Sequence, residues 1–144
     1  MRHDPALFLA LPLLLPTAAC FEDQVCTMAY VADQVEIIVE TPDLAEGEWT
    51  VTVDTASCTL TVPGGVESCT GGHPSLMLLM SEDGRSLNQM RLWEGAPATV
   101  DIELVHDGVV VFADAIEPAY VEEEPNGEGC GVVQWATVSI SLDD

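Results

Sequence analysis

Five cysteines and three histidines are the rarest side chains in this 144-residue sequence that could carry thiol, metal or acid-base chemistry, beside its 25 acidic residues. The odd cysteine count is informative, because in an exported protein a cysteine left over from disulfides needs another partner. The first cysteine, Cys20, directly follows small residues at positions 17–19, whereas the others lie far inside the chain, at positions 26, 58, 69 and 130. We therefore consider Cys20 separately from the other four.

The residues before Cys20 follow the order of a secretory signal. Arg2 and His3 come first, then an apolar run over residues 6–15 that only Pro12 interrupts, then the small residues at 17–19. This run is about half of the roughly 20 apolar residues that a transmembrane helix needs. We expect residues 1–19 to be a signal peptide that is removed from the mature protein.

The stretch Thr17-Ala18-Ala19-Cys20 resembles the lipobox of bacterial lipoproteins. The resemblance implies cleavage just before Cys20, a diacylglyceride on the Cys20 thiol and, usually, an acyl chain such as palmitate on the new N-terminus. Thr17 departs from the family, which prefers leucine there. Several acyl chains anchor a protein stably, because each buried methylene contributes about 0.8 kcal/mol. The resemblance therefore predicts a lipid anchor in the cell envelope, at the outer membrane, followed by a tether over residues 20–25.

The remaining cysteines form an even set in an oxidising compartment, where disulfides persist, and four cysteines allow three connectivities. Cys58 and Cys69 flank a turn signal at residues 63–65, so a local bridge is our first choice, which leaves Cys26 and Cys130 to tie the beginning of the domain to its last strand. The alternation of residues places Cys58 inward but Glu67, two residues before Cys69, outward. A bulge near the glycines would reconcile these directions, and so would a different pairing.

The histidines offer little support for catalysis. His73 lies in GGHPS and His106 in LVHDG, and no GxSxG nucleophile elbow accompanies them. We interpret both as solvated loop histidines, and we predict that the protein is not an enzyme. An envelope enzyme or enzyme accessory that uses His73 or His106 is the alternative. Zinc binding by Cys69 and His73 is disfavoured, because no paired CxxC motif is present.

Acidic residues dominate the charge of the chain. The formal charge is -22, from 25 acidic and 3 basic residues, and it is unchanged after cleavage because Arg2 and Asp4 are lost together. Such a surface repels phosphate groups, which disfavours nucleic acid and electrostatic membrane docking. The acidic loops at 81–84 and 122–129 could gather calcium ligands, although neither has EF-hand spacing. We predict solvated turns, with no metal and no cofactor, and keep a calcium-binding adhesion module as an alternative.

Most of the remaining chain has the patterns of short strands. Residues 49–54, 98–104 and 136–142 alternate between apolar and polar side chains, which is typical of half-buried strands. Residues 35–40, 75–80 and 88–93 are further candidates. Asp107-Gly108 predicts a tight turn inside a hairpin over residues 97–116, because it can take the positive backbone angles that such a turn requires.

These patterns predict one all-β domain over residues 26–144. Eight or nine short strands separated by turns favour an antiparallel sandwich of Ig-like or transthyretin-like type, and a small closed barrel is the second choice. No helical period of ten or more residues is convincing. The inward faces of the strands would supply the core.

Several short stretches are similar to small uncharacterised lipoproteins of myxobacteria and their relatives. They are CTMAYV at 26–31, PDLAEGEWTVTV at 42–53, TLTVP at 59–63, PATVDIEL at 97–104, DG at 107–108, PAY at 118–120 and EPNGEGCG at 124–131. A further cysteine that often follows in that family is absent at residues 132–134, so the family's disulfide pattern does not transfer directly. The resemblance implies an envelope location and a disulfide-containing β-sandwich, and it brings no established activity. We expect a non-catalytic binding or structural module with an envelope protein or a glycan as partner.

Overall fold

A computed structural model of the chain describes residues 26, 31–72 and 74–142. The predicted signal peptide, Cys20 and the tether lie outside the described residues. The described chain is all-β, as predicted, with no helix. Its ten strands are β1 (Gln34–Val39), β2 (Gly47–Val53), β3 (Ala56–Val62), β4 (Gly65–Thr70), β5 (Ser75–Met80), β6 (Leu87–Trp93), β7 (Val100–His106), β8 (Val109–Ile116), β9 (Val121–Glu123) and β10 (Val133–Ile140).

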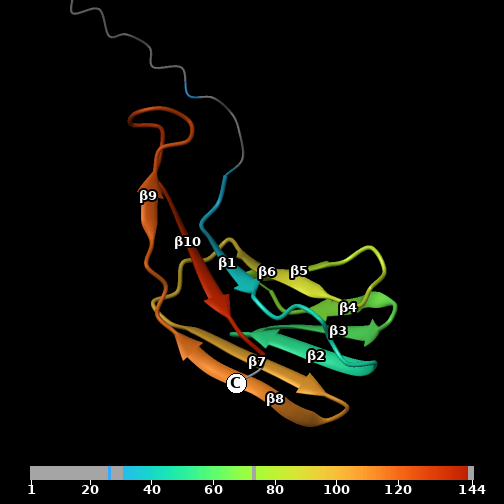
Figure 1. Cartoon of the computed structure of the whole chain (residues 1–144). Helices are drawn as coiled ribbons and strands as arrows, with labels where there is room; N and C mark the ends of the chain where they lie inside the picture. The colour runs from blue at the N-terminus through green and yellow to red at the C-terminus, as the bar shows by residue number, and fades with distance from the viewer. Residues whose placement is uncertain (1–25, 27–30, 73, 143–144) are drawn as a thin grey trace, which may run out of the picture.

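The strands form two five-stranded sheets that pack as a sandwich (Figure 1). The first sheet has the order β5-β6-β1-β10-β9, and the second has the order β4-β3-β2-β7-β8. Neither sheet closes into a barrel. The predicted all-β sandwich is confirmed, and its sheets are antiparallel except for one pair: β1 and β10 pair in parallel, from Gln34 with Trp135 to Val39 with Ile140. Two strands from opposite ends of the domain therefore lie side by side in the first sheet.

The core forms because alternate residues of each strand face the other sheet. β3 has a strict buried-intermediate alternation from Ala56 to Val62, and β2 has the same pattern from Trp49 onward. The buried side chains are apolar, and none of the described residues buries a polar or charged side chain. The largest fully buried residues include Ile37, Leu60, Leu87, Met90, Leu92, Ile102 and Leu104.

The loops lie at two opposite ends of the sandwich. The turn after β7 is tight, with positive φ angles at Asp107 and Gly108, as the sequence predicted. It lies at the same end as the β1–β2 loop, since Asp107 N donates to the Glu48 carbonyl at the start of β2. The β9–β10 loop lies at the other end, where it projects beyond the sheets (Figure 1).

Tyr120 supports the point where the chain crosses from the second sheet to the first. Its side chain packs against the core, and its hydroxyl donates to the Pro97 carbonyl at 2.7 Å. Burial raises the pKa of Tyr120 to about 12, with smaller contributions from the Asp54 and Asp33 carboxylates. The phenol therefore stays protonated and keeps its donor, which fixes the chain just after β8.

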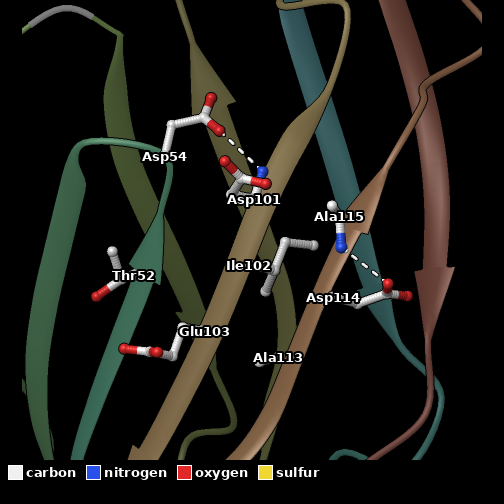
Figure 2. Close-up of a pocket in the computed structure, with 8 residues that line it drawn as sticks. All are labelled: Thr52, Asp54, Asp101, Ile102, Glu103, Ala113, Asp114 and Ala115. Carbon is white, nitrogen blue, oxygen red and sulfur yellow. Dashed lines mark hydrogen bonds between the residues drawn. The ribbon is translucent and has the colours of Figure 1, made fainter.

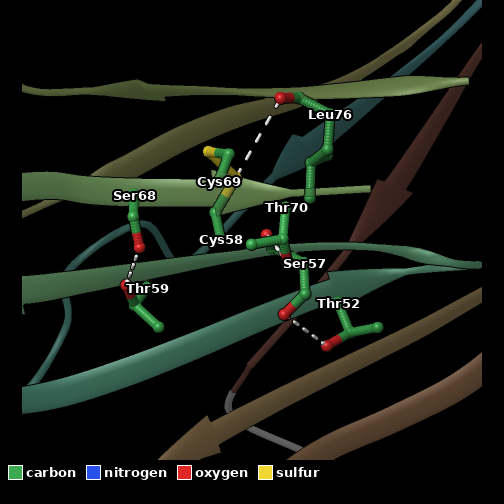
Figure 3. Close-up of a disulfide and its surroundings, with 8 residues drawn as sticks. All are labelled: Thr52, Ser57, Cys58, Thr59, Ser68, Cys69, Thr70 and Leu76. Carbon is green, nitrogen blue, oxygen red and sulfur yellow. Dashed lines mark hydrogen bonds between the residues drawn. A yellow bond between two sulfur atoms is a disulfide. The ribbon is translucent and has the colours of Figure 1, made fainter. Parts of the chain in front are cut away.

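Both disulfides that we favoured from the sequence are present. Cys58 of β3 and Cys69 of β4 are directly opposite each other and bonded (Figure 3). The register shifts between Thr59 and Leu60, so that Glu67 has no partner in the ladder. This bulge near the glycines resolves the conflict between Cys58 and Glu67. Cys26 is bonded to Cys130, which lies in the loop shortly before β10 and not within the last strand.

Candidate functional site

His106 has a structural environment, and the interpretation of this residue as a solvated loop histidine is wrong. It is the last residue of β7, opposite Trp49 of β2, and the two rings stack with centroids 4.5 Å apart. Its Nε2 lies 3.1 Å from the Glu46 carbonyl and 3.4 Å from the Asp107 carboxylate. The inward alternation of β7 continues through Ile102 and Leu104 to His106, and this signal could have revealed its position from the sequence.

The surroundings of His106 are closely packed. A Cβ atom on Gly47 would meet His106 Nε2 at 2.7 Å, and Trp49 Nε1 donates to the Ala45 carbonyl at 2.9 Å. Asp107 also accepts the backbone N–H of Glu48 at 3.0 Å. The histidine, tryptophan and aspartate therefore hold the β7–β8 turn against the start of β2. His73 lies outside the described residues.

The acidic loop at 81–84 uses its carboxylate within the loop. Asp83 Oδ1 accepts from the Ser81 hydroxyl at 2.6 Å and from the Arg85 backbone N–H at 3.2 Å. The Ser81 hydrogen bond, followed by that of Arg85, lowers the pKa of Asp83. In the described part of the chain, no group of three or more His, Cys, Asp or Glu side chains is placed to hold a metal ion.

A hollow in the described surface lies over β7 and β8 (Figure 2). We call it the β7–β8 hollow. Its volume is about 560 Å³, and its lining consists of Thr52, Asp54, Asp101, Ile102, Glu103, Ala113, Asp114 and Ala115. On the outer face of the sheet, Asp101 lies opposite Ala115 and Glu103 lies opposite Ala113. The hollow therefore pairs exposed carboxylates on β7 with small side chains on β8.

β8 borders this hollow and is an open edge of its sheet. It ends the strand order, so no described strand pairs with its outer side. Its first three residues, Val109, Val110 and Val111, are 65%, 53% and 41% exposed. The Ala115 N–H donates at 2.8 Å to the side chain of the adjacent Asp114 and not to another strand. This hydrogen bond shows that the Ala115 backbone faces the open side.

The positive charges of the described residues are already engaged. Arg91 pairs with Glu36 at 2.6 Å across β6 and β1, and Arg85 pairs with Glu46 at 3.1 Å. Neither arginine contacts the β7–β8 hollow. The carboxylates of Asp101 and Glu103 are exposed on the face of β7, so this region has a negative potential that a positively charged partner would neutralise.

Sequence reasoning predicted the β7–β8 hairpin but did not single out Asp101, Glu103, Ala113 or Ala115 as a surface. The alternation in residues 98–104 could have placed the carboxylates outward. The alanines opposite them follow only from the register, which shifts between Leu104 and Val105. A one-residue change in register would move each side chain to the other face.

Comparisons with known protein families, with curated proteins and with solved structures find no significant match to this chain. The described residues also contain no helix that is long and apolar enough to cross a membrane.

Proposed function

We propose that this protein is a lipid-anchored, non-catalytic module of the cell envelope, held at the outer membrane by acyl chains on Cys20, and that its sandwich domain binds a partner. The proposal combines the lipobox resemblance of residues 17–20 with a domain built for an oxidising compartment. The observation that carries it is the pair of disulfides, Cys26–Cys130 and Cys58–Cys69. Together they account for every cysteine except Cys20.

The position of the first disulfide also supports membrane anchoring. Cys26 follows Cys20 by six residues, which span at most about 20 Å when extended. A lipid on Cys20 would hold the end of the sandwich with the β9–β10 loop close to the bilayer. The turn between β7 and β8 lies at the opposite end and would remain accessible to partners.

The enzyme alternative has less support. The described contacts of His106 are with Trp49, the Glu46 carbonyl and Asp107, and none of these is a hydroxyl or thiol nucleophile. An activated nucleophile needs a base within hydrogen-bonding distance. The absence of catalysis, the absence of a cofactor and the behaviour of His73 stay predictions.

Replacing Cys20 tests the anchor directly. We expect Cys20→Ala to move the protein from the membrane fraction to the soluble fraction and to abolish incorporation of labelled palmitate. Thr17→Leu is the matched control, because it brings the segment closer to the family pattern and leaves the acceptor thiol intact. This variant should stay in the membrane fraction. Continued membrane association and labelling of Cys20→Ala would overturn the proposal.

A further inference from the structure

We infer that the open edge of β8 binds an extended segment of a partner protein in which basic and apolar residues alternate, so that the segment adds a strand to the second sheet. This inference deepens the proposed binding function and rests on it, although it does not require the lipid anchor. Strand addition supplies affinity through main-chain hydrogen bonds and specificity through alternate side chains. The open edge of β8 offers both main-chain hydrogen-bonding groups and alternating side chains.

Among the four edge strands of the described sheets, β8 is the most suitable. It has eight residues, compared with three in β9 and six in both β4 and β5. The edge at β4 is covalently held to β3 by Cys58–Cys69. The pairing of β8 with β7 is regular from Phe112 to Ile116. The register shift comes before this segment and leaves Val111 without a partner in the ladder.

The backbone of this regular segment presents hydrogen-bonding groups to the open side, where no described strand pairs with them. Ala115 N–H faces that side, since it bonds to the Asp114 side chain. Backbone groups alternate between the two sides of a strand, so the N–H and carbonyl of Ala113 face the same way. A partner carbonyl would replace the Asp114 carboxylate at Ala115, and Ala113 would complete the new ladder.

The side chains around this edge select the partner. An added strand would lie about 5 Å from β8 and about 10 Å from β7. Ala113 and Ala115 present only methyl groups on the outer face, so a Lys or Arg of the partner can extend across them to Glu103 and Asp101. The alternate partner residues would lie on the side of Phe112 and Ile116, which are partly buried against the core, with Asp114 between them. This arrangement favours a partner segment with basic residues on its outward face and apolar residues on its inward face.

A second copy of the chain fits this edge less well. Pairing β8 with β8 would bring together two molecules with a formal charge of -22 each. The described arginines, Arg85 and Arg91, are paired elsewhere and could not neutralise Asp101 and Glu103 at the joint. Like charges placed close together oppose association, whereas a basic partner gains from the same carboxylates.

The test uses the full chain, purified in detergent, with the end-blocked peptide Val-Lys-Val-Lys-Val-Lys-Val as probe and calorimetry as readout. A peptide of the same sequence with alternate backbone nitrogens methylated keeps the charge but cannot complete the ladder. We expect the methylated peptide to bind at least about tenfold more weakly, since it loses backbone hydrogen bonds. Equal binding of the two peptides would show attraction to net charge alone and would overturn the inference.

Variants of the chain test the same edge from the other side. Ala113→Pro removes an N–H that faces the open side and should weaken binding about tenfold, because edge positions tolerate proline but can no longer donate. Glu103→Gln should weaken binding about two- to fivefold, as expected for an exposed ion pair. Ala113→Arg is the second edge variant, because its side chain would occupy the hollow and pair with Glu103, so it too should weaken binding.

Circular dichroism confirms that each variant is folded. Unchanged binding by folded Ala113→Pro and Ala113→Arg would overturn the inference. A dimer of the unliganded chain that Ala113→Pro dissociates would assign β8 to self-pairing and would also overturn it. Loss of peptide binding is distinguishable from failure of the lipid anchor, because the detergent-purified chain reports binding alone and the Cys20→Ala fractionation reports anchoring alone.

Discussion

The two edges of the second sheet, β4 and β8, are held in different ways. β4 is bonded to β3 by Cys58–Cys69, and side-chain hydrogen bonds reinforce the same pair of strands, for example Thr59 with Ser68 at 2.8 Å. β8 has no covalent bond to β7, and its valines are exposed at the start of the strand. It is held by its backbone ladder with β7 and, after it ends, by the hydrogen bond of Tyr120 to Pro97.

This difference indicates how one sheet can combine stability with an available edge. The disulfide at β4 lies against the other sheet, with Cys58 Sγ 4.0 Å from the Leu76 carbonyl (Figure 3). It therefore stabilises both the strand pair and the contact between sheets. At β8 the backbone groups of Ala113 and Ala115 face the open side, where the Ala115 N–H donates locally to the Asp114 carboxylate. The closed edge stabilises the fold, and the open edge can exchange its hydrogen bonds for those of a partner.

Removing the disulfide at the closed edge should have the largest effect on stability. We expect Cys58→Ala combined with Cys69→Ala to lower the free energy of unfolding by about 3 kcal/mol, the loop-entropy value for a short bridge. Chemical denaturation measures this change. Hydrogen exchange should show faster opening of the β4 amides, while the β8 amides in the same sample serve as the control. Equal acceleration at both edges would contradict a local role for the disulfide.

Removing the Tyr120 hydroxyl should have the next largest effect. Tyr120→Phe loses one hydrogen bond to Pro97, so we expect a loss of about 1 kcal/mol in the free energy of unfolding near neutral pH. Burial raises the pKa of Tyr120 in the folded state from its ordinary value of 10.0 to about 12, so unfolded chains release this proton first as pH rises. The stabilisation is fully present below pH 10 and is lost as pH rises through the folded pKa of about 12.

The alkaline pH dependence gives this prediction a second readout. Wild-type stability should fall in that window by an amount that Tyr120→Phe does not show, as measured by denaturation at fixed pH values. The comparison of the two proteins removes the contributions of all other groups that titrate there. Identical alkaline profiles would contradict the structural role of the phenol.

The sequence predicted several strands because apolar and polar residues alternate along them, most clearly in β2, β3 and β7. The hairpin over residues 97–116 and the pairing of Cys58 with Cys69 follow from local turns and spacing. The parallel contact of β1 with β10 could not be predicted, because alternation indicates which side of a strand is buried but does not name its neighbour. β9 was missed for a similar reason, since Val121–Glu123 has no period of its own and forms along β10.

The same limit applies to the candidate site. Asp101 and Glu103 are outward residues of a predicted strand, but they are 2 of 25 acidic residues, and the sequence alone does not distinguish them from the other 23. Their importance comes from Ala113 and Ala115 directly opposite them, and therefore from the register of β7 with β8. For His106 the sequence does contain the signal, because the inward alternation of β7 extends to this residue. The Asp107-Gly108 turn beside it led to the prediction of a loop position instead.

Removing the charge of Asp114 should have the smallest effect on folding and the clearest effect on the open edge. Asp114 lies opposite the buried Ile102, so its carboxylate is on the inward-facing side of the edge strand, and it bonds to Ala115 N–H. Inward charges of this kind oppose pairing of an edge with another edge. We expect Asp114→Ala to change the free energy of unfolding by less than about 0.5 kcal/mol and to increase self-association, measured by sedimentation over a range of concentrations.

The control for this prediction is Asp101→Ala, which removes the same charge from β7, a strand inside the sheet. If Asp114 protects the edge specifically, Asp114→Ala associates at lower concentration than Asp101→Ala, and adding Ala113→Pro to Asp114→Ala restores the monomer. If net charge alone keeps the chain apart, both single variants associate equally. Equal association would therefore remove the distinction between β8 and the interior of its sheet, because the protection would then belong to the whole surface and not to one strand.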